Sequence, residues 1–600
     1  MGLWTRIGRE LKFITALNRV LKRIKPVDPN STTLVPDDWE KAVDQWGDHV
    51  AVIFEDRQVT YRELDAMANR YGHWIKGRGL RRGDVAALVM PNRIEYLAIW
   101  LGFAKVGVAT ALINNNLTGP GLAHSLAISG ASQIVADFST YEAVEQIRTQ
   151  LPKSGMLWVL GLRGDDETSD RRGLDAAVKG ASTVRPDKAS RYGMQAKETA
   201  LLIYTSGTTG LPKAARITHT RAQLYMLAFA AATKGTDKDR VYIVLPLYHS
   251  TGGLCAVGAA LMNGGAIVLR TKFSATHFWN DVVERQCTMF VYIGELCRYL
   301  VNTPQNELET KHKLRLAFGN GLRPEVWKVF QQRFRIPEIL EFYGSTEGNV
   351  SLFNFDGRPG AVGRIPPYLR NNFNVKLAKI DSDTNEELRG PNGLCIECKP
   401  GEIGEALGEI KKNDARGDYT GYADKAASEK KVLHDAFSKG DAWFRTGDLM
   451  RQDGDGYLYF VDRIGDTYRW KGENVSTTEI ADALSGAPKV KEVTVYGVPV
   501  PGMEGKAGMA AVVADDDFNI ADFAAFSDHT VADFARPVFV RLQKDITTTG
   551  TFKYTKTNLV ADGFDPKNTK DPMWYRDPDK GYLKITPKSF QKLDSGTMRL

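Results

Sequence analysis

The sequence predicts an α/β fold in which a large N-terminal domain of layered sheets and helices precedes a smaller α+β C-terminal domain. The chain has 600 residues, which is too long for one hydrophobic core. Short apolar runs typical of strands alternate with helical patterns, and this favours parallel strands covered by helices. The pattern changes to short strands and turns after about Asp448. We expect an amphipathic basic helix at 1–28, the large domain at 29–461 and a small mobile domain at 462–600.

The large domain is predicted to alternate strands and helices from its start. A strand at Val50–Phe54 precedes a helix at Tyr61–Arg78 and a strand at Val85–Val89. The apolar run Tyr96–Ile113 is interpreted as one buried helix, and Ser250–Leu269 as a buried helix and strand divided by two glycines. The later predicted strands are Ala200–Tyr204, Val241–Leu245, Ala266–Arg270, Met289–Ile293 and Leu314–Phe318.

The small domain is predicted to begin near Asp462, directly after a strand at Tyr457–Val461. A helix at Thr477–Leu484 and two strands, at Glu492–Val498 and Gly508–Val513, follow in the mixed order of an α+β unit. The segment after Gly563 is rich in Lys, Asp and Pro, so we expect it to be loosely ordered.

The composition excludes several classes of protein. Apolar residues make up 43% of the chain and charged residues 25%, which is typical of a globular protein and not of a disordered one. The net charge of +7 comes mostly from residues 1–25, which hold seven Lys or Arg and one Glu, so no nucleic-acid partner is expected. Five cysteines are too few for a disulfide scaffold. Cys395 and Cys398 form a C-x-x-C, for which buried thiols in a strand are favoured over a metal or redox site.

The N-terminal segment carries apolar residues at the three- and four-residue spacing of one helical face. A basic amphipathic helix of this kind lies among lipid headgroups, with its cations toward anionic lipid. The alternative is a helix docked on the protein's own body or on a partner. We favour the membrane surface, and thus a cytoplasmic protein that is peripheral on the inner face of the cell membrane. The apolar face consists of Leu3, Trp4, Ile7, Leu11, Ile14, Leu17, Leu21 and Ile24.

The most informative motif is Tyr204–Lys213, with the sequence YTSGTTGLPK, directly after a predicted strand. Glycines let backbone N–H groups turn toward an anion, hydroxyls add donors and Lys213 supplies positive charge. This chemistry suits a polyphosphate. The loop is not a Walker A motif, because Gly207 and Gly210 are only three residues apart and Ala214 follows the lysine.

This loop resembles the signature of the adenylate-forming superfamily, which includes acyl-CoA synthetases. Three further segments occur in the order that the superfamily shows. Glu341–Asn349 (EFYGSTEGN) resembles its adenine and magnesium motif, and Trp443–Asp448 (WFRTGD) resembles its ribose-binding motif. Asp462–Glu479 is the most discriminating segment and is similar to the fatty acid transport protein and very-long-chain acyl-CoA synthetase branch. The resemblance covers roughly residues 35–565.

The resemblance implies a reaction in two steps. A carboxylate attacks the α-phosphorus of ATP and expels pyrophosphate, and the thiol of CoA then takes the acyl group. Glu347 would hold Mg²⁺ and Thr346 would contact the α-phosphate. Asp448 would accept hydrogen bonds from the ribose hydroxyls, and Arg463 would also reach the nucleotide. The residues implied for the phosphates are Thr205, Ser206, Gly207, Thr208, Thr209, Gly210 and Lys213, and those implied around the adenine are Gly319, Asn320, Gly321, Tyr343, Gly344 and Ser345.

The resemblance also implies a C-terminal lysine that reaches the reacting carboxylate and the α-phosphate. Lys553 is assigned this role and Lys556 is the alternative, because Phe552 stands where most relatives have glycine before the lysine. Asp462 lies at the hinge about which the small domain would rotate to exchange this lysine for a CoA-binding surface. The candidates for that surface are Trp470, Lys471, Gly472 and Glu473.

The acyl chain is expected near Leu245–Gly253, with the sequence LPLYHSTGG. His249 is a candidate for the mouth of the acyl tunnel, with a core histidine as an equal alternative, and Gly252, Gly253 and Ala256 would leave room for a long chain. The expected substrates are a long- or very-long-chain fatty acid, ATP and CoA, with Mg²⁺, and ligation would be coupled to uptake. A homodimer is left open. Two alternatives stay open: a membrane fatty acid transporter without required catalysis, and an adenylating enzyme that loads a carrier protein.

Overall fold

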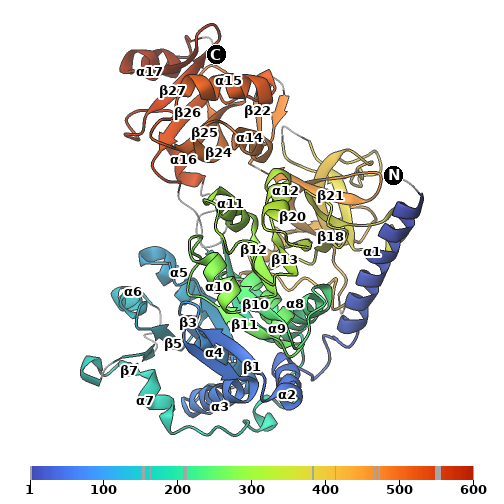
Figure 1. Ribbon diagram of the computed structural model, residues 1–600, viewed down its shortest axis with the longest axis vertical. Helices are drawn as coiled ribbons and strands as arrows, with labels where there is room; N and C mark the ends of the chain where they lie inside the picture. The colour runs from blue at the N-terminus through green and yellow to red at the C-terminus, as the bar shows by residue number, and fades with distance from the viewer. Residues whose placement is uncertain are drawn as a thin grey trace. The chain divides into compact units, whose positions relative to one another are not determined.

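The computed structural model describes residues 3–151, 156–162, 164–206, 212–381, 384–412, 414–464, 466–470, 473–503, 505–546, 556–598 and 600. The chain divides into two compact units (Figure 1). Unit 1 consists of residues 1–364 and 408–432, and unit 2 of residues 365–407 and 433–600. Layered α/β structure in unit 1 and an α+β C-terminal part in unit 2 confirm the predicted fold class. The domain boundary near Asp462 stays a prediction.

An eight-stranded sheet of unit 1 has the order β15-β14-β13-β12-β10-β11-β1-β2. The inner strands from β14 to β1 are parallel, and the edge strands β15 and β2 are antiparallel to their neighbours. Parallel neighbours end at the same edge of a sheet, so the turns after β12, β13 and β14 lie close together. The strands are β1 Val50–Phe54, β2 Arg57–Thr60, β10 Arg240–Ile243, β11 Ala266–Leu269, β12 Met289–Ile293, β13 Leu316–Asn320, β14 Glu338–Gly344 and β15 Ser351–Asn354.

The second sheet of unit 1 has seven strands in the order β7-β6-β5-β3-β4-β8-β9. All of its pairs are parallel except the last, because β8 and β9 form an antiparallel hairpin. The described ends of the predicted phosphate-loop motif lie on the last residues of β8 and the first residues of β9. The strands are β3 Val85–Val89, β4 Ala109–Ile113, β5 Gln133–Asp137, β6 Met156–Leu160, β7 Arg171–Gly173, β8 Thr199–Ser206 and β9 Pro212–Thr218.

Helix α4 (Ile94–Lys105) is buried along its whole length and packs against α3 (Tyr61–Gly77). The two helices approach so closely that a Cβ on Gly102 would lie 2.2 Å from the carbonyl oxygen of Ala68. The prediction of one helix over Tyr96–Ile113 is wrong, since α4 ends at Lys105 and residues 109–113 form the strand β4. The other helices of unit 1 are α1 Leu3–Ile24, α2 Val35–Trp46, α5 Gly119–Ser129, α6 Tyr141–Ile147, α7 Leu174–Lys179, α8 His219–Ala232, α9 Val257–Leu261, α10 Phe278–Glu284, α11 Gly294–Asn302 and α12 Pro324–Arg333.

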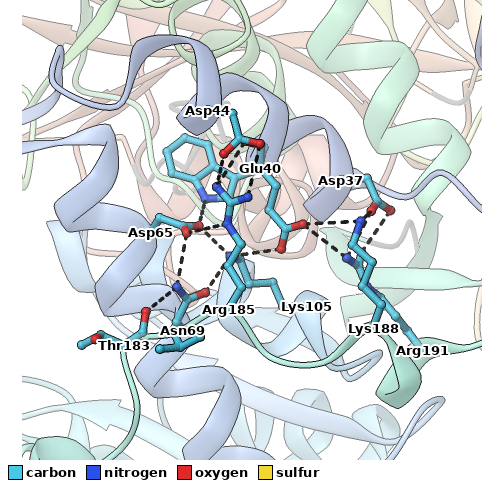
Figure 2. Close-up of polar contacts among 12 residues, drawn as sticks. Asp37, Glu40, Asp44, Asp65, Asn69, Lys105, Thr183, Arg185, Lys188 and Arg191 are labelled. Carbon is cyan, nitrogen blue, oxygen red and sulfur yellow. Dashed lines mark hydrogen bonds and ion pairs between the residues drawn. The ribbon is translucent and has the colours of Figure 1, made fainter.

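A buried network of charged residues fixes the segment that leads into β8 (Figure 2). The Lys105 ammonium, 1% exposed, lies 2.6 Å from the Asp65 carboxylate and 3.3 Å from that of Glu40. Arg185 contacts Asp65 and Asp44. Residues 183–191 are thereby held on helices α2, α3 and α4. Further contacts in Figure 2 join Asn69 to Lys105, Asp65 and the Thr183 carbonyl, and Lys188 and Arg191 to Asp37 and Glu40.

Unit 2 contains the strands β17 Val375–Lys379, β20 Ala442–Gln452 and β21 Tyr457–Arg463, and residues 403–407 of β18 Ile403–Glu409. These strands lie in the order β21-β20-β18-β17. Its C-terminal sheet has the order β24-β25-β26-β27-β28, shown in orange and red in Figure 1. The members of this sheet are β24 Val490–Pro499, β25 Lys506–Ala514, β26 Phe539–Gln543, β27 Met573–Asp577 and β28 Gly581–Lys584. Helices α13 Lys425–Glu429, in unit 1, and α14 Thr477–Leu484, α15 Ile520–Thr530, α16 Thr557–Asp562 and α17 Pro587–Asp594, in unit 2, complete the described helices.

The expectation of a loosely ordered tail after Gly563 is wrong. Strands β27 and β28 extend the C-terminal sheet, and Tyr575, Tyr582 and Leu593 are buried in its core. The alternating aromatic residues of this segment outweigh its high content of Lys, Asp and Pro. No helix within the described ranges is both long and apolar enough to cross a membrane. All five cysteines are free thiols, and Cys395 packs in a small apolar core with Leu407 and Trp443.

Candidate active site

The described part of the phosphate-loop motif lies where β8 ends and β9 begins, in unit 1. Thr205 on β8 pairs with Lys213 on β9, and Ser206 pairs with Pro212. The implied ligands Gly207, Thr208, Thr209 and Gly210 lie outside the described residues. The antiparallel pairing of β8 and β9 brings Thr205 and Lys213 side by side, although they are eight positions apart in the chain.

Tyr422 joins this hairpin to the magnesium motif. Its hydroxyl donates a 2.8 Å hydrogen bond to Oε1 of Glu347, and its oxygen is also hydrogen-bonded by Thr205. The Lys213 ammonium lies 5.7 Å from the centre of the Tyr422 ring. Segment 421–423 runs beside β9, with backbone hydrogen bonds from Arg216 and Ala423, and this fixes the ring. Burial and the Glu347 charge raise the pKa of Tyr422, so the hydroxyl stays a hydrogen-bond donor at neutral pH.

The motif Glu341–Asn349 forms β14 and the turn that connects it to β15. Gly344 pairs with Ser351 at the start of the return strand. Helix α8 holds this turn: the Arg221 guanidinium donates to the Gly348 carbonyl, and the Tyr225 hydroxyl donates to the Ser345 carbonyl at 3.0 Å. The hydroxyls of Thr346 and Ser250 lie 3.2 Å apart. Thr346 and Glu347 are therefore presented, half-buried, by a turn whose backbone is fixed from behind.

A buried carboxyl group controls the turn expected beside the adenine. Glu341, 2% exposed, accepts a 2.6 Å hydrogen bond from the Tyr292 hydroxyl and a 3.1 Å hydrogen bond from the backbone N–H of Leu322. Gly321 adopts a positive φ of 79°, which favours glycine. Burial raises the pKa of Glu341 to about 8. The structure thus places turn 319–321 and Tyr343 at the ends of the neighbouring parallel strands β13 and β14.

The ribose candidates lie in unit 2 on the antiparallel pair β20 and β21. Asp448 is opposite Arg463, whose Nε donates a 2.9 Å hydrogen bond to Oδ1 of the buried carboxylate. The backbone N–H of Gly447 donates to Glu405 at 3.0 Å, so a second buried carboxyl fixes the turn before Asp448. Burial raises the pKa of Glu405 to about 7, and the positive charge of Arg445 opposes this increase.

The expected hinge residue Asp462 fastens β21 to the first turn of α14. Its carboxylate accepts a 2.6 Å hydrogen bond from the backbone N–H of Thr477 and a 3.1 Å hydrogen bond from the Ser476 hydroxyl. Lys556 donates to the Thr477 hydroxyl at 2.7 Å. Trp470 is 3% exposed and lies in the C-terminal core, not on the surface expected for CoA. The preferred lysine Lys553 and the CoA candidates Lys471 and Gly472 lie outside the described residues, and the side chain of Glu473 is not described.

The region expected around the acyl chain is more tightly packed than its glycines predict. A Cβ on Gly252 would lie 2.6 Å from the Pro246 carbonyl oxygen, and one on Gly253 would lie 2.0 Å from that of Leu247. Backbone carbonyl groups occupy the place where a side chain at either glycine would lie, so both glycines allow a close approach of the backbone, and the room for an acyl chain stays a prediction. His249 is half-buried, with its ring centre 4.5 Å from that of Tyr248. Ala256 is buried in the π-helical turn Thr251–Ala256.

The residues of unit 1 fit a metal–nucleotide complex. Glu347, Thr346, Thr205 and the Tyr422 hydroxyl supply oxygen atoms, the donors that Mg²⁺ prefers. Among the described residues no group of three or more His, Cys, Asp or Glu side chains could hold a metal ion by itself. One carboxylate together with substrate phosphates is the usual protein contribution to a magnesium site.

Sequence reasoning missed four residues that position the site. Tyr422 and Arg221 contact the candidate motifs from distant segments, and Glu341 and Glu405 hold the turns that carry candidate residues. Glu341 is the first residue of the motif Glu341–Asn349, so its position in that motif could have indicated a role near the site. Tyr422 and Arg221 have none, because their positions depend on pairing with β9 and on the packing of α8.

Comparison with known proteins identifies relatives that cover most of the chain. The sequence profile of the AMP-binding enzymes matches residues 39–406, and that of the AMP-binding enzyme C-terminal domain matches residues 479–553. Human long-chain fatty acid transport protein 1 is 42% identical over 547 residues, which cover 90% of this chain and 84% of that protein.

Solved structures show the same fold. The anthranilate CoA ligase AuaEII in complex with anthranoyl-AMP aligns with a TM-score of 0.73 at 21% identity, over 89% of this chain and 97% of that one. ATP-bound MatB from Rhodopseudomonas palustris aligns with a TM-score of 0.72 at 24% identity, over 88% and 98% of the two chains.

Proposed function

We propose that this chain, which belongs to the AMP-binding enzyme family and is a relative of the long-chain fatty acid transport proteins, is an ATP-dependent fatty acid–CoA ligase. The acid would be a long- or very-long-chain fatty acid, activated as an acyl-adenylate and transferred to CoA. Ligation would be coupled to fatty acid uptake, because conversion to the CoA ester keeps the internal concentration of free acid low.

The observation that carries this proposal is the cluster of Thr205, Lys213, Tyr422 and Glu347. Two motifs that are far apart in sequence meet there, one rich in anion-binding groups and the other supplying a carboxylate. Such a cluster can bind a polyphosphate and a hard cation together, as adenylation requires. In the proposed site Glu347 would hold Mg²⁺, which would neutralise charge on the phosphates. Thr346 would contact the α-phosphate, and Asp448 with Arg463 would bind the ribose.

The proposal includes a second step at a CoA-binding surface of the C-terminal part. Lys553 would assist adenylation and then give way to residues 471–473 after rotation about Asp462. Trp470, which precedes these residues in the chain, is buried in the C-terminal core. We also propose a peripheral location on the inner face of the cell membrane, where a long-chain acid is concentrated. A homodimer is compatible with all of these features.

The test is product analysis with purified protein, ATP, Mg²⁺ and saturated acids from octanoate to very long chains, each with and without CoA. The proposal predicts that pyrophosphate release yields acyl-CoA, needs CoA for multiple turnovers and is faster with long acids. Full turnover without CoA would favour the carrier-loading alternative. Fatty acid transfer across vesicles without pyrophosphate release would favour a transporter without catalysis. A preference for short, soluble acids would contradict the substrate class.

A further inference from the structure

Helix α1 is fixed to the body of unit 1 along one face, and this face is not its most apolar one. Phe13, Ala16 and Val20, at helical spacing, are buried against the body. The Phe13 ring packs edge-on against Phe355, with ring centres 5.9 Å apart. Helix α1 therefore lies along α8 as part of the folded unit, not as a free arm.

Polar contacts hold the helix along its length. In the first half of α1, Glu10 accepts a 2.5 Å hydrogen bond from Arg364. Arg19 donates to the Ala231 carbonyl and Arg23 to the Met262 carbonyl, each at 2.7 Å, in the second half. These contacts fix the rotation of α1 about its own axis, so the side chains on its opposite face must point outward.

The outward face carries the first part of the apolar stripe. Trp4 is 83% exposed, Ile7 41% and Leu11 60%. The same face continues, at three- and four-residue spacing, with the exposed polar residues Thr15 and Asn18. Large apolar side chains gathered on one exposed surface mark an interaction site, because exposing them together to water is unfavourable unless another surface covers them.

The charges around this patch indicate what covers it. Helix α1 contains six basic residues and one acidic residue, Glu10, which is already paired with Arg364 and Arg9. Arg6 and Lys12 are exposed at the flanks of the apolar patch, and Lys22 lies further along the outward face. An indole and aliphatic side chains flanked by cations match the boundary between the headgroups and acyl chains of an anionic membrane.

We propose that Trp4, Ile7 and Leu11 insert into an anionic phospholipid surface while the opposite face of α1 stays docked on unit 1. Helix α1 is then a membrane anchor that is rigidly attached to unit 1, and not a flexible tether. It holds the phosphate-binding unit itself against the membrane, where an acid of low solubility is collected. The collection of acid rests on the proposed ligase function, but binding to lipid does not.

The test is cosedimentation with vesicles of phosphatidylcholine alone and with about 30 mol% phosphatidylserine. Wild-type protein should bind the mixed vesicles more strongly, and salt should weaken the binding. The triple variant Trp4→Ser/Ile7→Ser/Leu11→Ser should lose about tenfold or more of its binding. Thr15→Leu/Asn18→Leu, which extends the patch along the same face, should increase binding. The matched control is Val184→Ser/Tyr192→Ser, which removes exposed apolar side chains elsewhere in unit 1 and should bind as wild type.

All of these positions are exposed, so the melting temperature should not change. Unaltered vesicle binding by the triple variant, or no binding by the wild type, would overturn the proposal. Loss of a dimer without loss of vesicle binding would assign the patch to a second copy of the chain. Ligation of soluble octanoate should be the same in the triple variant and the wild type. If neither the wild type nor any variant ligates an acid, but vesicle binding still depends on Trp4, Ile7 and Leu11, the ligase proposal fails and the lipid-binding proposal is retained.

Discussion

The hydroxyl of Tyr422 lies 2.8 Å from Oε1 of Glu347 and joins two motifs separated by more than a hundred residues. The tyrosine also stacks under the Lys213 ammonium, so one ring connects the expected metal ligand with the expected phosphate-binding lysine. The arrangement makes Tyr422 a positioning residue for both.

Tyr422→Phe should keep the ring beneath Lys213 and remove only the hydrogen bond to Glu347. A hydrogen bond to a charged group contributes about 1.5–3 kcal/mol, so we expect roughly a tenfold or greater loss of adenylation. The Mg²⁺ concentration for half-maximal rate should increase. Pyrophosphate exchange measured over a Mg²⁺ titration tests this. Tyr61→Phe is the control, because that hydroxyl donates to the Gly265 carbonyl at 2.7 Å, away from Glu347. Equal effects of both variants would show that Tyr422 has no special role.

Glu341 should make stability depend on pH. Burial raises its pKa from about 4.5 to about 8, so the stabilisation is complete below about pH 4.5 and is lost as the pH rises toward 8. Within this window the loss is at most about 1.4 kcal/mol per pH unit. Glu341→Gln cannot ionise, so its melting temperature relative to wild type should rise from about pH 5 to about pH 8. A difference that is constant with pH would show that Glu341 does not titrate in this range.

The Lys105 ammonium should contribute more to stability than the exposed Lys188 of the same network. Lys105→Met leaves the buried carboxylates of Asp65 and Glu40 with less positive charge, at a cost of about 3 kcal/mol. The Lys188 side chain is 67% exposed, so Lys188→Met should cost about 1 kcal/mol or less. Thermal unfolding of both variants measures the difference. Similar small shifts in melting temperature would mean that the network is not a structural anchor.

Gly253 should be required for packing and not for acyl space. Alanine there would place its Cβ 2.0 Å from the Leu247 carbonyl oxygen, and we expect a destabilisation of about 1–3 kcal/mol. Gly77→Ala in α3 is the control, since nothing lies within 4 Å of its Cβ and helix propensity favours alanine by up to about 1 kcal/mol. Gly253→Ala with an unchanged melting temperature and a shorter preferred acyl chain would place this glycine on the acyl path.

Lys553→Ala should reduce adenylation by about 10²–10³ or more, while thioester formation from supplied acyl-adenylate largely survives. Lys556→Ala is the matched variant, three residues away, and removes the 2.7 Å hydrogen bond to Thr477. It should lower the melting temperature and keep most of the adenylation activity. A larger loss of adenylation in Lys556→Ala would transfer the catalytic role to that residue.

Strands built from unbroken apolar residues were predicted closely. Val85–Val89 and Met289–Ile293 have the predicted bounds, and the helix Thr477–Leu484 begins after the capping residue Ser476. Composition and periodicity gave wrong predictions where tertiary packing determines whether a segment is a helix or a strand. The run Tyr96–Ile113 turns from helix to strand after Gly107, whose φ is +79°.

Some residues of the candidate site could be predicted from local sequence and others could not. Glu347 and Asp448 were predicted because each is a carboxylate within a recognisable local motif. Their supports, Tyr422 and Glu405, come from segments that approach only through sheet pairing and burial. The docking of α1 through Phe13, Ala16 and Val20 was not predicted either, because these residues lie on a different face of the helix from the apolar stripe.

Single-turnover pyrophosphate release is the decisive measurement of whether this protein forms an acyl-adenylate from ATP and a fatty acid. Purified protein is mixed with ATP, Mg²⁺ and a long-chain acid in the absence of CoA, beside Glu347→Gln and Asp448→Asn variants that remain folded. We expect about one pyrophosphate and one acyl-adenylate per active site, dependent on the acid and strongly reduced in both variants. Absence of acid-dependent pyrophosphate from folded, ATP-binding wild-type protein, or equal release by all three proteins, would contradict this expectation.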